Sequence, residues 1–260
     1  MATINLEKIK QAVEREDGLL PKIKIVGVGG AGVNAVNRMV TSGMHGVEFI
    51  VTDCLAQALI LSKAENRIQL GENVTKGLTA GANPEIGQKA AEEARDALIE
   101  NLRGADIVCI VAGMGGGTGT GASPILATCA KEAGAMTIAV VVKPFLFEGQ
   151  RRKAQAEAGI VKLKEHVDML VTIANESLLA VMDRNTSMID AFRYSDETVF
   201  RAVRAMLEIV AVPGPAWCKL IVKSDTDGKM QKMRKRNKIC QNKKGKMAAG
   251  RTGNGCNYAC

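Results

Sequence analysis

Long apolar runs are missing from this 260-residue sequence. No stretch approaches the ~20 apolar residues that a membrane-spanning helix requires, and the charged N-terminus lacks the apolar segment of a secretory signal. The seven cysteines include no C-x-x-C pair. Cys109 falls in a strand-like pattern and Cys129 in a helix-like pattern, positions where buried free thiols are usual. We therefore expect a cytoplasmic protein with no transmembrane segment and with reduced cysteines.

An excess of acidic charge is also absent, and the formal net charge of +8 is unevenly distributed. Residues 1–222 contain 24 Lys and Arg against 25 Asp and Glu, whereas residues 223–260 contain 11 against 2. The basic segment is poor in branched apolar residues and has no hydrophobic period, which favours a disordered, solvated tail. The alternative is an interaction segment that contacts acidic surfaces, either nucleic acid or an anionic membrane.

Strand-like and helix-like patterns alternate along most of the chain. This alternation predicts an α/β fold, in which a doubly wound, mostly parallel, Rossmann-like sheet carries helices on both faces. We expect strands at 22–26, 46–51, 67–70, 106–112, 136–142 and 168–173, and helices at 33–42, 55–61, 84–102, 122–133, 151–165 and 196–210.

Glycine is concentrated in two segments, each between a strand and a helix. Residues 27–32 read G-V-G-G-A-G and match G-x-G-x-x-G, and residues 113–121 hold six glycines in nine positions. A strand, a glycine loop and a helix form a phosphate-binding layout, because free backbone amides and the helix N-terminus attract anions. The alternative for the second segment is a flexible surface loop, but both of its flanks have ordered patterns.

The first glycine segment alone fits a nicotinamide-dinucleotide-dependent oxidoreductase, since Asp53 follows Gly32 by 21 residues, about where a ribose-binding acid would lie. The second segment favours a triphosphate instead, because loops at strand C-termini share one edge of a parallel sheet. A G-x-x-x-x-G-K-[ST] motif is absent. The phosphate charge would therefore be met by backbone amides, helix ends, a metal ion and nearby side chains.

Three stretches together resemble the FtsZ family of tubulin-like bacterial cell-division GTPases. They are residues 27–39, residues 113–124, which contain the tubulin-superfamily signature G-G-G-T-G-T-G, and residues 144–149. The resemblance extends from about residue 20 to about residue 214. It implies a polar extension at 1–20, a GTP-binding domain at 21–214, and a basic tail at 215–260 in place of the family's second domain.

The resemblance also assigns residues to a GTP site. In the family, the first glycine segment and an asparagine hold the nucleotide, a loop approaches the γ-phosphate, and the signature loop wraps the phosphates. An acid contacts the ribose, a basic residue lies near the sugar and phosphates, and an asparagine, an aromatic ring and an aspartate form the guanine pocket. The residues that match the first glycine segment and its asparagine are Gly29, Gly30, Gly32 and Asn34, and those that match the γ-phosphate loop are Gly81 and Ala82. The signature loop is matched by Gly116, Gly117, Thr118, Gly119 and Thr120. Glu148 matches the ribose-contacting acid, Arg152 the basic residue, and Asn175, Phe192 and Asp196 the guanine pocket.

Five of these residues also have a purely structural interpretation. Glu148 and Arg152 lie four apart, as in a surface ion pair on a helix. Asn175 fits a turn, Phe192 a core position and Asp196 a helix N-cap. Their joint match to the spacing of one family favours the nucleotide site. A carboxylate at position 196 would select guanine over adenine, because it accepts hydrogen bonds from N1 and the amino group.

The resemblance ends after residue 214. The family continues with an acidic N-x-D-x-x-D loop, which completes the nucleotide site of the next subunit and positions the attacking water. Here Trp217, Lys219 and Val222 stand at the asparagine and aspartate positions. No carboxylate remains there to orient water or to accept its proton, so we expect no catalytic residue in this chain. The abrupt loss of pattern fits a truncated or frameshifted reading frame.

The family's function implies a GTP/GDP-binding protein that uses Mg²⁺ and polymerises head to tail with like subunits into filaments of the division ring. GTP would be hydrolysed at subunit interfaces, with this chain defective in supplying catalysis, and other division proteins would be further candidate partners. The helix that begins at Asp196 packs on the second domain in the family. Without that domain, we expect Val199, Val203, Met206, Leu207 or Val210 to form an exposed apolar patch on the helix. The alternative is that the tail covers these side chains.

Overall fold

The computed structural model describes residues 21–183 and 186–211. The polar extension expected at 1–20 and the basic tail expected at 215–260 lie outside these ranges, as do Trp217, Lys219 and Val222.

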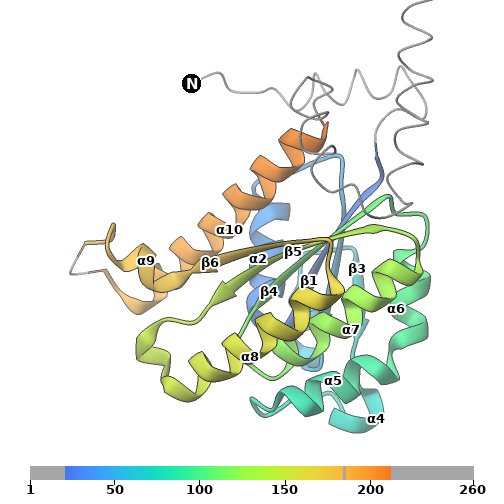
Figure 1. Cartoon of the computed structure of the whole chain (residues 1–260), viewed down its shortest axis with the longest axis horizontal. Coiled ribbons are helices and arrows are strands. Elements are labelled where there is room, and N and C mark those ends of the chain that lie inside the picture. Colours follow the sequence, from blue (N-terminus) through green and yellow to red (C-terminus); the bar gives the residue numbers. More distant parts are fainter. Residues whose placement is uncertain (1–20, 184–185, 212–260) are drawn as a thin grey trace, which may run out of the picture. The chain divides into compact units, whose positions relative to one another are not determined.

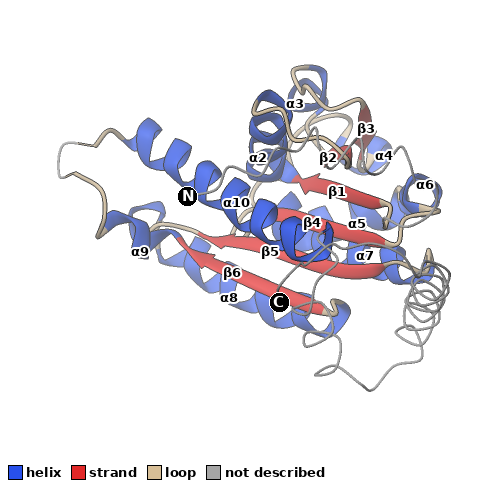
Figure 2. Cartoon of the chain, turned by 90° about the horizontal axis from the view of Figure 1, so that it is seen from above, coloured by secondary structure: helices blue, strands red, loops and turns tan. Residues whose placement is uncertain are grey.

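Six parallel strands form one sheet in the described part of the chain, in the order β3-β2-β1-β4-β5-β6 (Figures 1 and 2). This confirms the predicted doubly wound, Rossmann-like α/β fold. The central strand β1 pairs with β2 on one side and with β4 on the other, so the winding direction reverses between β1 and β4. The strands are β1 (Ile23–Val28), β2 (Glu48–Asp53), β3 (Asn66–Gln69), β4 (Ile107–Gly113), β5 (Met136–Lys143) and β6 (Met169–Ala174).

Helices cover both faces of the sheet (Figure 1). One face carries α2 (Gly29–Thr41) and α10 (Met188–Ala211), and the other carries α5 (Pro84–Glu93), α6 (Arg95–Leu102), α7 (Thr118–Glu132) and α8 (Gln150–His166). This double cover explains why the central strands read as continuous apolar runs. Shorter elements complete the described chain: α3 (Ala56–Ile60), α4 (Glu72–Thr75), α9 (Asn175–Leu179) and the 3₁₀ turn η1 (Leu146–Glu148).

Three helices differ from their predicted bounds. The helix expected from Ala122 begins four residues earlier, at Thr118, so Pro124 lies inside α7 rather than in its first turn. The helix expected over 84–102 is divided at Ala94 into α5 and α6. The helix expected from Asp196 is continuous from Met188, which places Asp196 inside α10 and excludes its interpretation as an N-cap.

The predicted apolar patch on α10 is wrong for the side chains that the structure describes. Val199 and Val203 are 1% and 0% exposed, and they lie in a core with residues of α2 and of strands β1, β2, β4 and β5. Met206 and Leu207 are partly buried against the same core. Val210 lies beyond the described side chains. The sheet and α2 therefore cover much of the surface for which we expected a second domain to be needed.

Two further expectations concern cysteines and membranes. Cys54, Cys109 and Cys129 are free and buried, as predicted for the last two, and burial raises the pKa of the Cys109 thiol to about 12. In residues 21–183 and 186–211, no helix combines the length and the hydropathy that crossing a bilayer requires.

Candidate functional site

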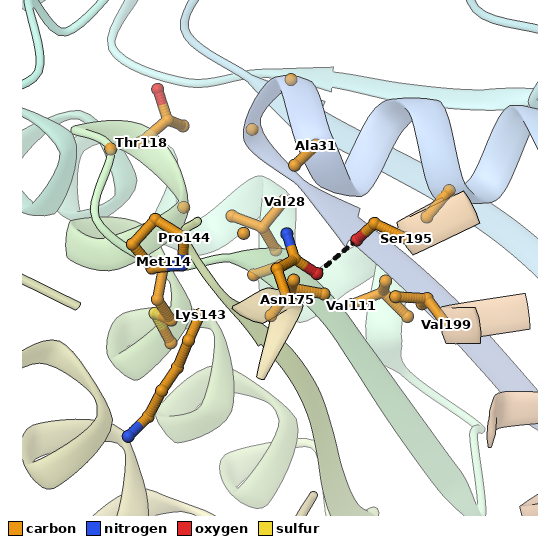
Figure 3. Close-up of a pocket in the computed structure, with 18 of the residues that line it drawn as sticks. Val28, Ala31, Val111, Met114, Thr118, Lys143, Pro144, Asn175, Ser195 and Val199 are labelled. Carbon is orange, nitrogen blue, oxygen red and sulfur yellow. Dashed lines mark hydrogen bonds between the residues drawn. The ribbon is translucent and has the colours of Figure 1, made fainter. Parts of the chain in front are cut away.

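A pocket of about 280 Å³ opens at the carboxyl edge of the sheet, over the point where the strand order reverses (Figure 3). Doubly wound sheets bind ligands at such a crevice, because loops leave neighbouring strands there in opposite directions. Four strands end at the pocket, and the residues at or just after those ends line it: Val28 and Gly29 for β1, Gly113 and Met114 for β4, Lys143 and Pro144 for β5, and Asn175 for β6.

The two glycine segments meet at one end of this pocket. A Cβ atom added to Gly29 would lie 2.9 Å from the backbone nitrogen of Gly119, and Gly29 has a φ of +69°. Only glycine combines that backbone conformation with so close an approach. Gly30 and Thr118, one from each segment, line the same cavity. The two segments therefore face one pocket, as predicted, and a ligand in it could contact both.

Two helix N-termini point into the same end. Helix α2 begins at Gly29 and α7 begins at Thr118, and residues of both first turns line the pocket. Neither helix has an acidic residue in its first turn or a side-chain hydrogen bond at its N-cap. The first N–H groups of a helix have no intrahelical acceptor, and the helix dipole adds partial positive charge there. This end of the pocket therefore attracts an anion.

Side chains and close packing hold the second glycine segment in shape. The Thr120 hydroxyl accepts a hydrogen bond from the Gly115 backbone N–H at 2.8 Å. A Cβ atom on Gly115 would lie 2.7 Å from the Arg152 carbonyl oxygen, and one on Gly117 would lie 2.8 Å from the Ala80 Cβ. The segment is therefore packed between α8 and the loop before α5, which argues against the flexible surface loop.

Polar and aromatic side chains form the other end of the pocket. The Ser195 hydroxyl donates a hydrogen bond to Asn175 Oδ1 at 2.7 Å (Figure 3). Phe192 is 41% exposed, and its ring packs edge-on against Phe145 with centroids 5.4 Å apart. Phe192 is thus not a core residue, and Asn175 is the buried first residue of α9 rather than a turn residue.

Asp196 contributes the acidic group at this end of the pocket. Burial raises the pKa of its carboxyl group to about 6, and the nearby Arg38 guanidinium offsets part of that shift. Arg38 itself is bound to Glu197, with 2.8 Å between Arg38 Nε and Glu197 Oε2. Within residues 21–183 and 186–211, no cation is bound directly to the Asp196 carboxylate at the pocket, so it can accept hydrogen bonds from a ligand.

Glu148 and Arg152 also line the pocket. They form the ion pair that their spacing suggests, with 2.5 Å between Arg152 Nη1 and Glu148 Oε2. Glu148 Oε1 also accepts the Phe145 backbone N–H at 2.9 Å, which fixes the carboxylate. The surface-pair interpretation and the ligand-site interpretation are therefore compatible.

The geometry and the sequence lead to one family. A model of the Tubulin/FtsZ family, GTPase domain, matches residues 22–183. The chain belongs to this family. It is 38% identical to M. jannaschii FtsZ, which was solved as an empty dimer, with a TM-score of 0.74 over 82% of this chain and 61% of that one. A W319Y mutant of M. jannaschii FtsZ matches at 38% identity and a TM-score of 0.73, over 80% of this chain and 63% of that one.

A more distant structure shares the fold. CetZ1 from Haloferax volcanii, solved as a GDP-bound monomer, is 24% identical with a TM-score of 0.63, over 69% of this chain and 58% of that one. The chain thus spans about three fifths of the length of the FtsZ structures that it matches.

Most of the residues that the FtsZ resemblance assigned to nucleotide binding are brought together by the fold. Those that line the pocket are Gly29, Gly30, Gly116, Gly117, Thr118, Gly119, Glu148, Arg152, Asn175, Phe192 and Asp196. Five others lie outside the lining. Gly32 packs α2 on the sheet, since a Cβ there would lie 2.4 Å from the Val111 carbonyl oxygen, and Thr120 holds the glycine segment. Asn34, Gly81 and Ala82 are exposed.

Sequence reasoning missed several lining residues, including Ala31, Met114, Lys143, Pro144, Ser195 and Val199. Lys143 directly precedes the P-F-L-F-E-G stretch and Pro144 is its first residue, so both could have been found from their position at the end of a strand. Ser195 had no sequence signal apart from its place beside Asp196, because its contact with Asn175 joins residues 20 positions apart.

The oxidoreductase alternative is not supported in this Tubulin/FtsZ chain. Asp53, its expected ribose ligand, is 5% exposed and is absent from the pocket lining. Its Oδ1 accepts the Cys54 backbone N–H at 2.7 Å, and burial raises the pKa of its carboxyl group. Asp53 therefore ends β2 by bonding to the backbone that follows it, and the comparisons place the chain in a GTPase family.

Proposed function

We propose that this chain binds GTP and GDP in the pocket at the carboxyl edge of the sheet. The observation that carries the proposal is the meeting of two glycine segments and two uncapped helix N-termini at one end of a single pocket, opposite a carboxylate. The phosphates would lie at the glycine end, where Gly30, Gly116 and Thr118 present backbone amides. Membership of the Tubulin/FtsZ GTPase family supports this orientation.

The guanine base would lie at the opposite end, between Asn175, Phe192 and Asp196. An ionised Asp196 accepts hydrogen bonds from the N1 and amino groups of guanine, whereas adenine offers no donor at N1. A site that leaves a buried acceptor unpaired discriminates strongly against the wrong base. Phe192 supplies an aromatic surface beside the base, and the Glu148–Arg152 pair would lie near the ribose and phosphates.

A magnesium ion would bind chiefly through the nucleotide. In the described parts of the chain, no three His, Cys, Asp or Glu side chains gather as a metal site. Mg²⁺ commonly keeps several waters and takes phosphate oxygens as ligands, so it needs few ligands from the protein. When bound, it would neutralise phosphate charge beside the amides of Gly116–Gly119.

We also propose that the chain associates head to tail with like subunits, as part of the division apparatus at the division site in the cytoplasm. M. jannaschii FtsZ was solved as a dimer and H. volcanii CetZ2 as a GTPγS-bound protofilament, which supports self-association in this family. With Trp217, Lys219 and Val222 at the positions of the family's acidic loop, this chain would offer a nucleotide face to a partner but would not complete a neighbour's site. The domain would extend over 21–214, with the basic tail free for acidic surfaces.

Titration of the full chain with fluorescent GTP, GDP, ATP and NAD, with and without magnesium, tests nucleotide binding. We expect GTP and GDP to bind with similar affinity and ATP to bind at least about tenfold more weakly. Adenine carries no hydrogen on N1, so it cannot donate a hydrogen bond from N1 to the Asp196 carboxylate. NAD should not compete. Tighter binding of NAD than of GTP, or equal binding of ATP and GTP, would contradict the proposal.

A further inference from the structure

The turn at residues 80–83 has an unfavourable backbone conformation. Gly81 and Ala82 have φ values of +58° and +57°, and the Asn83 N–H donates to the Ala80 carbonyl at 3.0 Å. Two successive positive φ values closed by this hydrogen bond define a type I′ turn. Gly81 adopts the conformation freely, but the Cβ of Ala82 crowds its own backbone. The surrounding structure must therefore hold Ala82 in place.

This turn lies directly against the second glycine segment. A Cβ atom on Gly117 would lie 2.8 Å from the Ala80 Cβ and 3.0 Å from the Asn83 backbone nitrogen. Gly117 itself lines the pocket at the end that attracts anions. Any displacement of the turn would therefore change the shape of the wall next to the bound phosphates.

A single side chain of α8 ties the turn to the rest of the site. Gln155 Nε2 donates a hydrogen bond to the Ala82 carbonyl oxygen at 3.3 Å, across 73 positions of sequence. The other amide atom, Gln155 Oε1, is buried and has no hydrogen-bond partner in the described part of the chain. Gln155 thus holds the turn through one hydrogen bond. Arg152, one turn earlier on α8, lines the pocket, so the helix joins the turn to the site.

We propose that Gln155 is a positioning residue for the γ-phosphate end of the nucleotide site. Its hydrogen bond holds Ala82 in the strained conformation. The turn at residues 80–83 then fixes the position of the pocket wall beside Gly117. This inference rests on the proposed function, in which the phosphates lie along the glycine segment. The family resemblance implies that the loop with Gly81 and Ala82 approaches the third phosphate, so we expect a displaced turn to weaken the binding of GTP more than the binding of GDP.

The test compares the full chain with its Gln155→Leu variant, using a non-hydrolysable GTP analogue and GDP in fluorescence titrations with magnesium. We expect the affinity for the analogue to fall about fivefold, the effect of one neutral hydrogen bond, and the affinity for GDP to change less than about twofold. Gln88→Leu is the matched control, because Gln88 Nε2 bonds to the exposed Glu92 at 2.9 Å on the same helix, α5. The control should alter neither affinity.

A second substitution separates positioning from general damage. Ala82→Gly removes the backbone strain, so the turn should form without Gln155, and the double variant should regain the wild-type ratio of the two affinities within about twofold. Gln155→Asn, whose amide is too short to reach Ala82, gives the same comparison if the leucine variant does not fold. Equal losses for both nucleotides, or no loss for either, refute the positioning role. A wild-type chain that binds neither nucleotide refutes the proposed function instead.

Discussion

Some of the residues proposed to bind the nucleotide lower the stability of the fold, and Asp196 is the clearest case. Its folded-state pKa of about 6 lies above the ordinary value of 3.8, so the folded protein holds a proton that the unfolded chain releases between about pH 4 and pH 6. Stability contributed by the protonated form is therefore lost as the pH rises through that window. An ionised, partly buried carboxylate then remains at neutral pH, where it is available to a guanine base.

The Asp196→Asn variant should consequently be more stable than wild type at pH 7.5, by about 1–2 kcal/mol after allowance for partial solvent exposure, and equal to it near pH 4. Its affinity for GTP should fall about tenfold or more, because a charge-assisted acceptor is lost. Urea unfolding at several pH values and GTP titration measure the two effects. Glu197→Gln is the control of opposite sign: Arg38 lowers the pKa of Glu197, so that variant should be less stable at pH 7.5. A stability gain at pH 4 as large as at pH 7.5 would contradict the assignment.

Among the helices and strands, sequence patterns predicted the order and type of the larger elements because these rest on apolar periodicity. The start of α7 was missed because Thr-Gly-Thr-Gly has a poor intrinsic preference for helix. Tertiary contacts impose the helix there: a Cβ on Gly121 would lie 2.0 Å from the Pro84 carbonyl oxygen, so glycine allows α5 and α7 to touch. Tertiary contacts also limited how much of the candidate site could be predicted from the sequence. The family resemblance identified Gly30 and Thr118, but the contact between Ser195 and Asn175 depends on how α10 crosses the sheet.

Helix α10 gives a prediction about how the domain is stabilised. Val203 is fully buried beside α2 and the sheet, so Val203→Ala should lower the free energy of unfolding by about 2 kcal/mol through lost apolar burial and a residual cavity. Arg201→Ala on the same helix is the control. Arg201 is exposed and pairs with Glu197 at 3.0 Å, and loss of such a surface pair should cost less than about 1 kcal/mol. Urea denaturation followed by circular dichroism compares them. Equal effects would mean that α10 is not packed on this core in solution.

The chain has the pocket in which we propose that nucleotide binds, but it carries Trp217, Lys219 and Val222 where the FtsZ resemblance places an acidic loop. In the proposed head-to-tail association, one subunit contributes its nucleotide face and the next contributes the opposite face, which carries the acidic loop in the family. Loss of the acidic loop should therefore impair the opposite face and leave the nucleotide face able to bind a partner. The pure chain with GTP should neither sediment as filaments nor hydrolyse GTP at the rate of an intact FtsZ subunit.

Added at low ratio to an intact FtsZ, such as the M. jannaschii protein, the chain should instead join a filament end through its nucleotide face and block growth there. Filaments should then shorten, and GTP turnover should fall by more than simple dilution predicts. Gly30→Ala is the matched control. Apart from the adjoining residues of its own helix, no described atom lies within 4 Å of the added Cβ, so the fold should be kept while the methyl group narrows the proposed phosphate end of the pocket. That variant should bind nucleotide weakly and should block filament growth less than the unmodified chain does. Sedimentation, electron microscopy and phosphate release measure these outcomes. If the pure chain formed GTP-dependent filaments, the face opposite the pocket would be able to bind a neighbouring subunit without the acidic loop, and the prediction would be wrong.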